Sequence, residues 1–281
     1  MPNFITVQDI INRKNGPKIV MLTAYDYPSA VLADQAGIDV ILVGDSLANV
    51  VLGLKSTTDV GMPGMIHHAK AVRRAVKTAL MAVDMPFDSV SAGIDEALVH
   101  CQTMVKETGC DAVKIEWCDG CLDIIRAVTA QNIPVIGHVG LTPQTAEQLG
   151  GFKVQGKDAL SAKRIIQQAV AMELAGCFCL VLECIPSPLA KILTSKLRIP
   201  TIGIGAGHDC DGQVLVMHDI LGMFSGFRPK FVKQYANCSA VISQAMTQFK
   251  NEVQSGHFPD ESNEYQMNDN ELKILLKDAE N

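Results

Sequence analysis

The sequence has no long hydrophobic run, few aromatic residues and no excess of basic residues. No segment reaches the roughly 18 uninterrupted apolar residues of a membrane-spanning helix, so we expect no membrane partner. The net charge at pH 7 is −6, and residues 257–281 hold seven acidic residues and two lysines, so the rest is nearly neutral. Nucleic-acid binding usually needs a basic patch, and none is expected here. The first residues, MPNFITVQDI, lack the basic-then-apolar plan of a signal peptide, which predicts a cytoplasmic protein.

The cysteines do not form an obvious disulfide framework. Their number is nine, which is odd, and most lie in apolar segments such as CFCLVLEC. In a cytoplasmic chain such residues are usually small buried hydrophobes. Cys118 and Cys121 have C-x-x-C spacing, but a redox or zinc role would need a thioredoxin context or a second ligand pair. Neither is evident, and the role of this pair stays open.

What is present is a regular alternation of strand-like apolar runs and segments of helical length. Each of six runs ends in a polar or ionisable group, and two further strands are expected near residues 199–207 and 212–222. Such alternation predicts a (β/α)8 TIM barrel with its chemistry at the carboxyl ends of the strands. We expect one catalytic domain over residues 1–256 and an acidic tail over residues 257–281. The six runs are residues 19–22, 40–43, 80–83, 112–115, 135–137 and 177–182.

The segments between the strands predict the helices. An amphipathic helix near residues 235–254 is expected to complete the barrel body, and residues 271–277 to form one or two turns. The loop at residues 52–64 is long enough to be a lid, and a second substantial loop is expected at residues 148–156. The remaining helices are expected at residues 28–36, 65–78, 94–107, 121–130, 159–174 and 188–197.

Two aspartates follow different strands. Asp45 and Asp84 would meet at the mouth of a barrel, where two hard oxygen ligands suit Mg²⁺ together with water and substrate oxygens. The alternative is that each aspartate caps the helix or turn that follows it.

Lys114 and Glu116 alternate with apolar residues on one strand, so both project from the same face. Unpaired charges there would be costly. They therefore either pair with each other or serve a site, with Lys114 holding an anionic substrate oxygen and Glu116 supporting the metal directly or through water.

Glu183 and His138 end two further apolar runs. An apolar setting disfavours the ionised form of a carboxyl group, which suits Glu183 to the role of general base. The alternative for Glu183 is a salt bridge to a neighbour. His138 is either a hydrogen-bonded core histidine or an active-site polar group.

Eight ordered segments of the chain resemble one enzyme family. They are TAYDYPSA, ILVGDSLANVVLG, STTDVGMPGMIHHAKAV, VDMPF, AVKIE, IGHVGLTPQ, LECIP and TIGIGAGHDCDGQVLVMHD. Over roughly residues 3–265 the sequence is similar to the 3-methyl-2-oxobutanoate hydroxymethyltransferases, also called ketopantoate hydroxymethyltransferases. It departs from their pattern at residues 117–120, where Trp-Cys-Asp-Gly replaces a usual pair of glycines and makes a bulkier loop.

The resemblance implies a barrel of the phosphoenolpyruvate mutase/isocitrate lyase superfamily. It also implies transfer of a hydroxymethyl group from 5,10-methylenetetrahydrofolate to 3-methyl-2-oxobutanoate, giving 2-dehydropantoate for pantothenate and coenzyme A biosynthesis. Glu183 would be the proton acceptor, and the chain would form a homo-oligomer, with a decamer expected. The resemblance implies Mg²⁺ binding by Asp45, Asp84 and Glu116, and substrate binding by Asp45, Ser46, Asp84 and Lys114. No folate-binding residues are assigned.

Two other interpretations remain at this point. One is a different enzyme of the same superfamily, such as a carbon–carbon lyase, which a cysteine in the lid loop would favour; residues 53–64 contain none. The other is a non-catalytic barrel, which loss of Asp45, Asp84 or Glu183 would have favoured, yet all three are present.

Overall fold

Eight parallel strands form a closed barrel in the order β1 to β8, as the alternation predicts. The computed structural model describes residues 4–146, 149–224, 226 and 228–279. The first residue of the expected loop at 148–156 therefore lies outside the described residues. Residues 1–3 of the expected domain and residues 280–281 of the expected tail lie outside them too. The strands are β1 Ile19–Thr23, β2 Val40–Val43, β3 Leu80–Asp84, β4 Ala112–Glu116, β5 Val135–Gly140, β6 Cys179–Glu183, β7 Thr201–Ile204 and β8 Gly212–Leu215.

Alternating side chains of these strands build two separate apolar layers. One set, which includes Met21, Leu42 and Val181, fills the barrel interior. The other set, which includes Ile41 and Val113, packs against the surrounding helices. The runs are nearly continuous in apolar residues because both faces of each strand are covered.

The outer helices begin and end at recognisable signals. Asp26 and Asp158 cap α2 and α8 with their carboxylates, and Gly109 ends α6 in the left-handed conformation. The helices are α1 Val7–Asn12, α2 Tyr27–Gln35, α3 Leu47–Val50, α4 Met62–Ala75, α5 Phe87–Ser91, α6 Ile94–Thr108, α7 Cys121–Ala130, α8 Ala159–Ala175, α9 Ser187–Lys196, α10 Met217–Leu221, α11 Cys238–Ser255 and α12 Asp269–Ala279. Short 3-10 turns lie at η1 Thr57–Asp59, η2 Pro143–Thr145 and η3 Glu261–Asn263.

The two ends of the barrel differ in how they are closed. At the amino end of the strands, Ile10 of α1 is fully buried and belongs to the interior apolar layer. Helix α1 therefore plugs this end. The carboxyl end has no such plug among the described residues and opens into a cavity described below.

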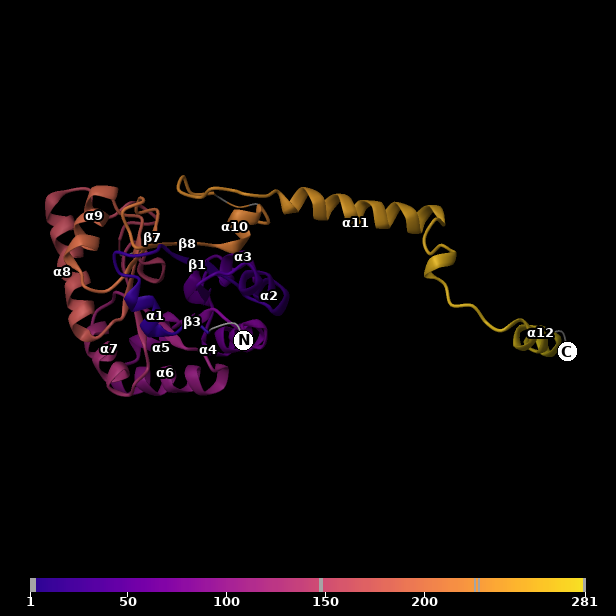
Figure 1. Ribbon diagram of the computed structural model, residues 1–281, viewed down its shortest axis with the longest axis horizontal. Coiled ribbons are helices and arrows are strands. Elements are labelled where there is room, and N and C mark those ends of the chain that lie inside the picture. The colour runs from indigo at the N-terminus through magenta and orange to yellow at the C-terminus, as the bar shows by residue number, and fades with distance from the viewer. Residues whose placement is uncertain (1–3, 147–148, 225, 227, 280–281) are drawn as a thin grey trace.

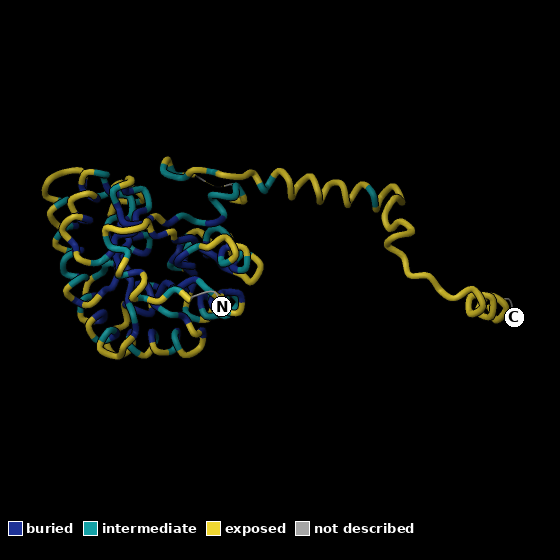
Figure 2. The backbone as a smooth tube through the Cα atoms, viewed as in Figure 1, coloured by how far each residue is buried: buried dark blue, intermediate teal, exposed yellow. Residues whose placement is uncertain are grey.

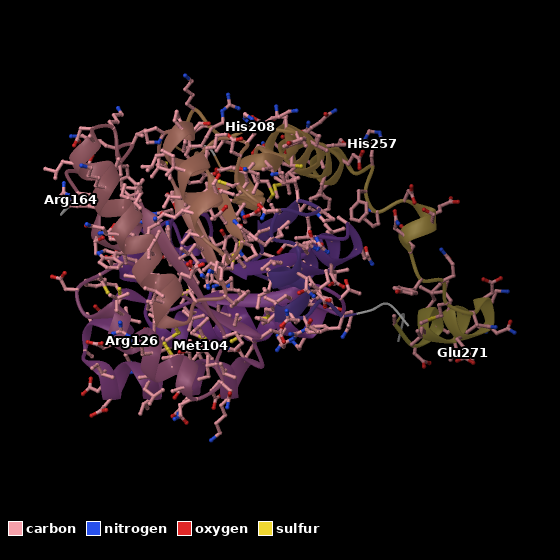
Figure 3. The ribbon with its side chains drawn as sticks, turned by 60° about the vertical axis from the view of Figure 1, so that its left-hand side comes forward. Met104, Arg126, Arg164, His208, His257 and Glu271 are labelled. Atoms are coloured by element: carbon pink, nitrogen blue, oxygen red, sulfur yellow. The ribbon has the colours of Figure 1, made fainter. Side chains whose placement is uncertain are left out.

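The C-terminal part departs from the expectation. Helix α11 forms where an amphipathic helix was predicted, but it extends away from the barrel and none of its residues is buried (Figures 1 and 2). The expectation that it completes the barrel body was therefore wrong. Helix α12 is also longer than the one or two turns expected, and Figure 3 shows His257 and Glu271 on this outlying segment. No helix within the described ranges is long and apolar enough to span a bilayer.

Candidate active site

Along four neighbouring strands the inward-facing side chains change from apolar to ionisable toward the carboxyl end. On β4, Ala112 belongs to the interior apolar layer, and Lys114 and Glu116 follow it at a period of two. As predicted, the two charged residues share a face, and that face lines the interior cavity. The other inward series are Leu80, Ala82 and Asp84 on β3, Ile136 and His138 on β5, and Cys179, Val181 and Glu183 on β6.

A buried ion pair joins β3 to β4. The parallel register places Asp84 beside Lys114, and the lysine Nζ lies 2.6 Å from the aspartate Oδ1. Lys114 Nζ is 3.9 Å from Glu116 Oε1, so Lys114 pairs more closely with Asp84 than with Glu116. Burial alone would lower the pKa of Lys114, but the carboxylates of Asp84, Glu116 and Asp45 outweigh burial and raise it. The cavity therefore contains a permanent ammonium group.

Asp45 lies directly beyond β2 and faces the same ion pair. Its backbone N–H donates to Asp84 Oδ2 at 3.0 Å, and its own Oδ2 accepts from Gln144 Nε2 at 2.8 Å. Helix α3 begins after it with no side-chain cap. The alternative that Asp45 is a helix cap is therefore wrong. Burial, together with the carboxylates of Asp84 and Glu116, raises the pKa of Asp45 well above its ordinary value.

Gln144 is a site residue for which the residue patterns gave no role. It lies on the 3-10 turn after β5, and its Nε2 also donates to the Met85 carbonyl at 3.0 Å. Its backbone N–H donates to Glu116 Oε2 at 3.1 Å. One residue thus fixes the carboxylates of Asp45 and Glu116 at once. Pro143 predicts a turn here, but nothing in the sequence predicts where the turn would place the amide.

His138 lies between two carboxylates and is almost fully buried. Its Nδ1 is 3.1 Å from Glu116 Oε1, and its Nε2 is 3.3 Å from Glu183 Oε2. Burial alone would lower the pKa of His138, but Glu116 beside it raises the pKa to about 9. The imidazolium is therefore hydrogen-bonded to Glu116 through Nδ1, whereas Nε2 lies within ion-pair distance of Glu183 without a hydrogen bond. Glu183 is the most exposed of the three, at 16% of its side chain.

These side chains form the floor of a cavity of about 580 Å³. Ser46 lines it too, and its Oγ is 2.7 Å from the Tyr25 hydroxyl. Gly53, Leu54 and Lys55 of the expected lid loop line the mouth. The ionisable residues on the floor are Asp45, Asp84, Lys114, Glu116, His138 and Glu183.

The floor carries more negative than positive charge, and this bears on metal binding. Glu116 already accepts from Gln144 and contacts His138, and no group of three His, Cys, Asp or Glu side chains in the described residues is arranged to hold an ion. Mg²⁺, however, commonly takes only one or two carboxylates, with water and substrate oxygens completing its shell. Asp45 and Asp84 fit that requirement, and the raised pKa of Asp45 indicates negative charge that a cation would neutralise. Glu116 fits a contact through water.

The bulkier loop at residues 117–120 lies beside this cavity rather than in it. Trp117 and Cys118 line two clefts of about 280 and 240 Å³ and are not among the residues that line the 580 Å³ cavity. Arg164 and Arg126, labelled in Figure 3, belong to these clefts. Cys118 and Cys121 are both free thiols.

Comparison with known proteins gives a consistent result. A family model described as ketopantoate hydroxymethyltransferase matches residues 4–261. The 3-methyl-2-oxobutanoate hydroxymethyltransferase of Moorella thermoacetica is 52% identical over 253 residues, which cover 90% of this chain and 94% of the relative. That of Syntrophobacter fumaroxidans is 50% identical over 275 residues, with 98% of each chain covered.

Solved structures share the fold. 2,3-Dimethylmalate lyase, a member of the PEP mutase/isocitrate lyase superfamily, has a TM-score of 0.60 at 15% identity, with 98% of this chain and all of that chain covered. Phosphonopyruvate hydrolase in complex with oxalate and Mg²⁺ has a TM-score of 0.59 at 14% identity, with 98% and 95% covered. At these identities the likeness shows the barrel architecture alone, which confirms the predicted fold class.

Proposed function

The chain belongs to the ketopantoate hydroxymethyltransferase family of transferases, and we propose that it transfers a hydroxymethyl group from 5,10-methylenetetrahydrofolate to 3-methyl-2-oxobutanoate. The observation that carries the proposal is the floor of the 580 Å³ cavity, where a buried ammonium group and several carboxylates meet. A small 2-oxo acid needs a cationic partner for its oxygens and a base near its branched carbon. Lys114 and Glu183 supply these two groups.

Substrate binding is assigned to Lys114 and Ser46 directly and to Asp45 and Asp84 through Mg²⁺. Lys114 attracts the negatively charged oxygens of the keto acid, and Ser46 offers a hydroxyl on the cavity wall. Asp45 and Asp84 would hold Mg²⁺, with Glu116 acting through water and Gln144 fixing both Asp45 and Glu116. Bound Mg²⁺ would act as a Lewis acid that polarises the keto group and acidifies the neighbouring C–H.

Glu183 is proposed as the base that removes this proton. Its carboxylate lines the cavity, with Oε2 3.3 Å from His138 Nε2, and a carboxylate in reach of the substrate can act as a general base. The ammonium of Lys114 stabilises the enolate oxygen that results. The enolate carbon then bonds to the methylene carbon of the donor. This methylene carbon loses its bonds to both folate nitrogens: the first breaks as the carbon–carbon bond forms, and water replaces the second and supplies the hydroxyl group. The proton taken by Glu183 and one proton of the water end on the two nitrogens, and tetrahydrofolate leaves.

Proton exchange at the branched carbon of 3-methyl-2-oxobutanoate tests this assignment directly. The wild-type protein in D₂O with MgCl₂ should exchange that proton without folate, and EDTA should stop the exchange. Addition of 5,10-methylenetetrahydrofolate should then yield 2-dehydropantoate, which NMR detects. The proposal fails if neither exchange nor product appears with Mg²⁺ and the folate donor present.

We also propose that the chain forms a homo-oligomer, with a decamer expected from the family resemblance. Val241, Met246 and Phe249 of α11 are 68%, 66% and 57% exposed, which is costly for an isolated helix in water. A second copy of the chain would cover them. Light scattering should give a mass well above one chain for wild type and a smaller mass for Phe249→Glu. A monomeric wild-type protein would contradict the proposal.

A further inference from the structure

One carboxylate in the cavity takes no part in the chemistry described above. Asp219 lies in the first turn of α10 and lines the cavity on the β8 side. Its carboxylate makes no hydrogen bond or ion pair with any residue in the described ranges, and burial raises its pKa. A half-buried acceptor without donors is unfavourable in the free protein. It is suited to a ligand that brings donors.

The surroundings of Asp219 are apolar and aromatic. Phe224, Phe231 and Pro229 line the same cavity, and all three lie on the segment of the chain that follows α10. The ring of Phe231 covers the carboxyl end of β7, because a Cβ atom added at Gly205 would lie 2.7 Å from it. The part of the chain after β8 therefore contributes both ring surfaces and the Asp219 acceptor to the cavity, a combination that favours a flat ligand with donors on one edge.

This aromatic side adjoins the proposed base. Ile204 of β7 lines the cavity and is paired in register with Glu183 of β6. A ligand held by Phe231 at the end of β7 would therefore lie next to Glu183. The keto acid is an anion, so Asp219 repels it and does not serve it. A cavity of about 580 Å³ also leaves room beside so small a substrate.

The pterin ring of the donor has the matching chemistry. It is flat, and its N3–H and 2-amino group point the same way, so that one carboxylate can accept both hydrogen bonds side by side. We infer that Asp219 and Phe231, which both line the cavity, form its pterin subsite, an inference that rests on the function proposed above. Asp219 binds the amino-pyrimidine edge, Phe231 packs on the ring, and the methylene carbon is thereby presented to the enolate beside Glu183.

The test measures tetrahydrofolate binding in the presence of keto acid and Mg²⁺ by calorimetry. Asp219→Asn replaces one acceptor oxygen by an N–H that would oppose the pterin donors, and the Kd should rise roughly 10- to 100-fold. The fold-change in Kd should be at least about ten times the fold-change in the rate of keto-acid proton exchange. The matched control is Asp88→Asn, because Asp88 is an exposed aspartate that follows β3 and does not line the cavity. Its Kd should equal that of wild type.

A second ligand separates contact from an indirect effect. A tetrahydrofolate analogue with a methyl group in place of the 2-amino group should bind wild type more weakly than tetrahydrofolate, and Asp219→Asn should weaken its binding little further. Three results would each overturn the inference. The Asp219→Asn variant could bind tetrahydrofolate as tightly as wild type, or wild type could bind both ligands equally. The third is that Asp219→Asn loses tetrahydrofolate affinity and proton exchange by equal factors. Wild-type transfer is measured first. If it is absent the proposed function fails as well, whereas normal transfer with an unaffected Asp219→Asn variant overturns only the subsite.

Discussion

The two ends of the barrel treat their carboxylates in opposite ways. At the amino end, Asp39, Asp111 and Asp211 each directly precede a strand, pair with one cation and accept a backbone N–H from the neighbouring strand. The cation pairs are Arg13 with Asp39 at 2.7 Å, Arg73 with Asp111 at 3.0 Å and Lys14 with Asp211 at 2.8 Å. The backbone donors are Val20 at 2.9 Å, Met81 at 2.8 Å and Thr201 at 2.9 Å, in the same order.

At the carboxyl end the charges are not matched one to one. Asp45, Asp84 and Glu116 surround the single ammonium of Lys114, and the pKa of Asp45 is raised by burial and by the other carboxylates. The rigid barrel holds these groups together although they repel. This difference indicates that the carboxylates at the amino end stabilise the fold, whereas those at the carboxyl end are available to bind ligands.

The largest expected effect is on catalysis. Glu183→Gln should slow Mg²⁺-dependent proton exchange by roughly 100- to 10,000-fold, because an amide cannot accept the proton. NMR in D₂O gives the rate. Glu107→Gln is the matched control, since Glu107 is an exposed glutamate paired with Lys70 on the outer surface. An exchange rate in Glu183→Gln within twofold of wild type would be incompatible with Glu183 as the base.

A substitution at the amino end of the barrel should instead change the stability of the protein. Asp211→Asn leaves Lys14 without its anion and should lower the free energy of unfolding by about 3 kcal/mol. Urea unfolding measures this change, and the exchange rate below the transition should match wild type. A stability equal to wild type would remove the distinction between the two ends.

The same pair predicts a pH dependence. Burial alone would raise the pKa of Asp211, but the hydrogen bonds from Lys14, Asn15 and Thr201 lower it. A carboxyl group with a lowered pKa in the folded state stabilises the protein fully above its unfolded pKa of about 3.9. The stabilisation is lost as the pH falls through the folded value. The stability gap between wild type and Asp211→Asn should therefore be constant from pH 7 to 5 and narrow below pH 4; a gap that narrows above pH 5 would contradict it.

The smallest expected effect is a gain in stability, opposite in sign to that of Asp211→Asn. In metal-free protein, Asp45→Asn removes one charge from the crowded carboxyl end and keeps an oxygen for Gln144 to donate to. The free energy of unfolding should rise by about 1 kcal/mol, because like-charge repulsion is relieved. Thermal unfolding in EDTA would detect this, and a loss of stability would contradict it.

Strand ends and periodicity allowed much of the active site to be predicted. The period of two on β4 placed Lys114 and Glu116 together, and the apolar runs located Asp84, His138 and Glu183 at strand ends. Gln144 reaches the site from a 3-10 turn, and a turn's direction depends on the packing around it rather than on a local repeat.

Two further features show where local patterns stop. Asp219 follows the last strand in a short helix whose position depends on the closed barrel. The amphipathic pattern of α11 correctly indicated an apolar face, but a pattern cannot say whether its own barrel covers that face. The aspartates before β2, β4 and β8 did carry a sequence signal, namely an aspartate directly ahead of an apolar run.

A crossed measurement on two isosteric variants tests the contrast between the barrel ends most directly. Asp45→Asn and Asp211→Asn are each assayed for unfolding in EDTA and for keto-acid proton exchange with Mg²⁺. The account predicts that Asp45→Asn gains stability and loses exchange, whereas Asp211→Asn loses stability and keeps exchange. If both variants lose stability and exchange together, the two ends do not divide stability from chemistry and the account is wrong.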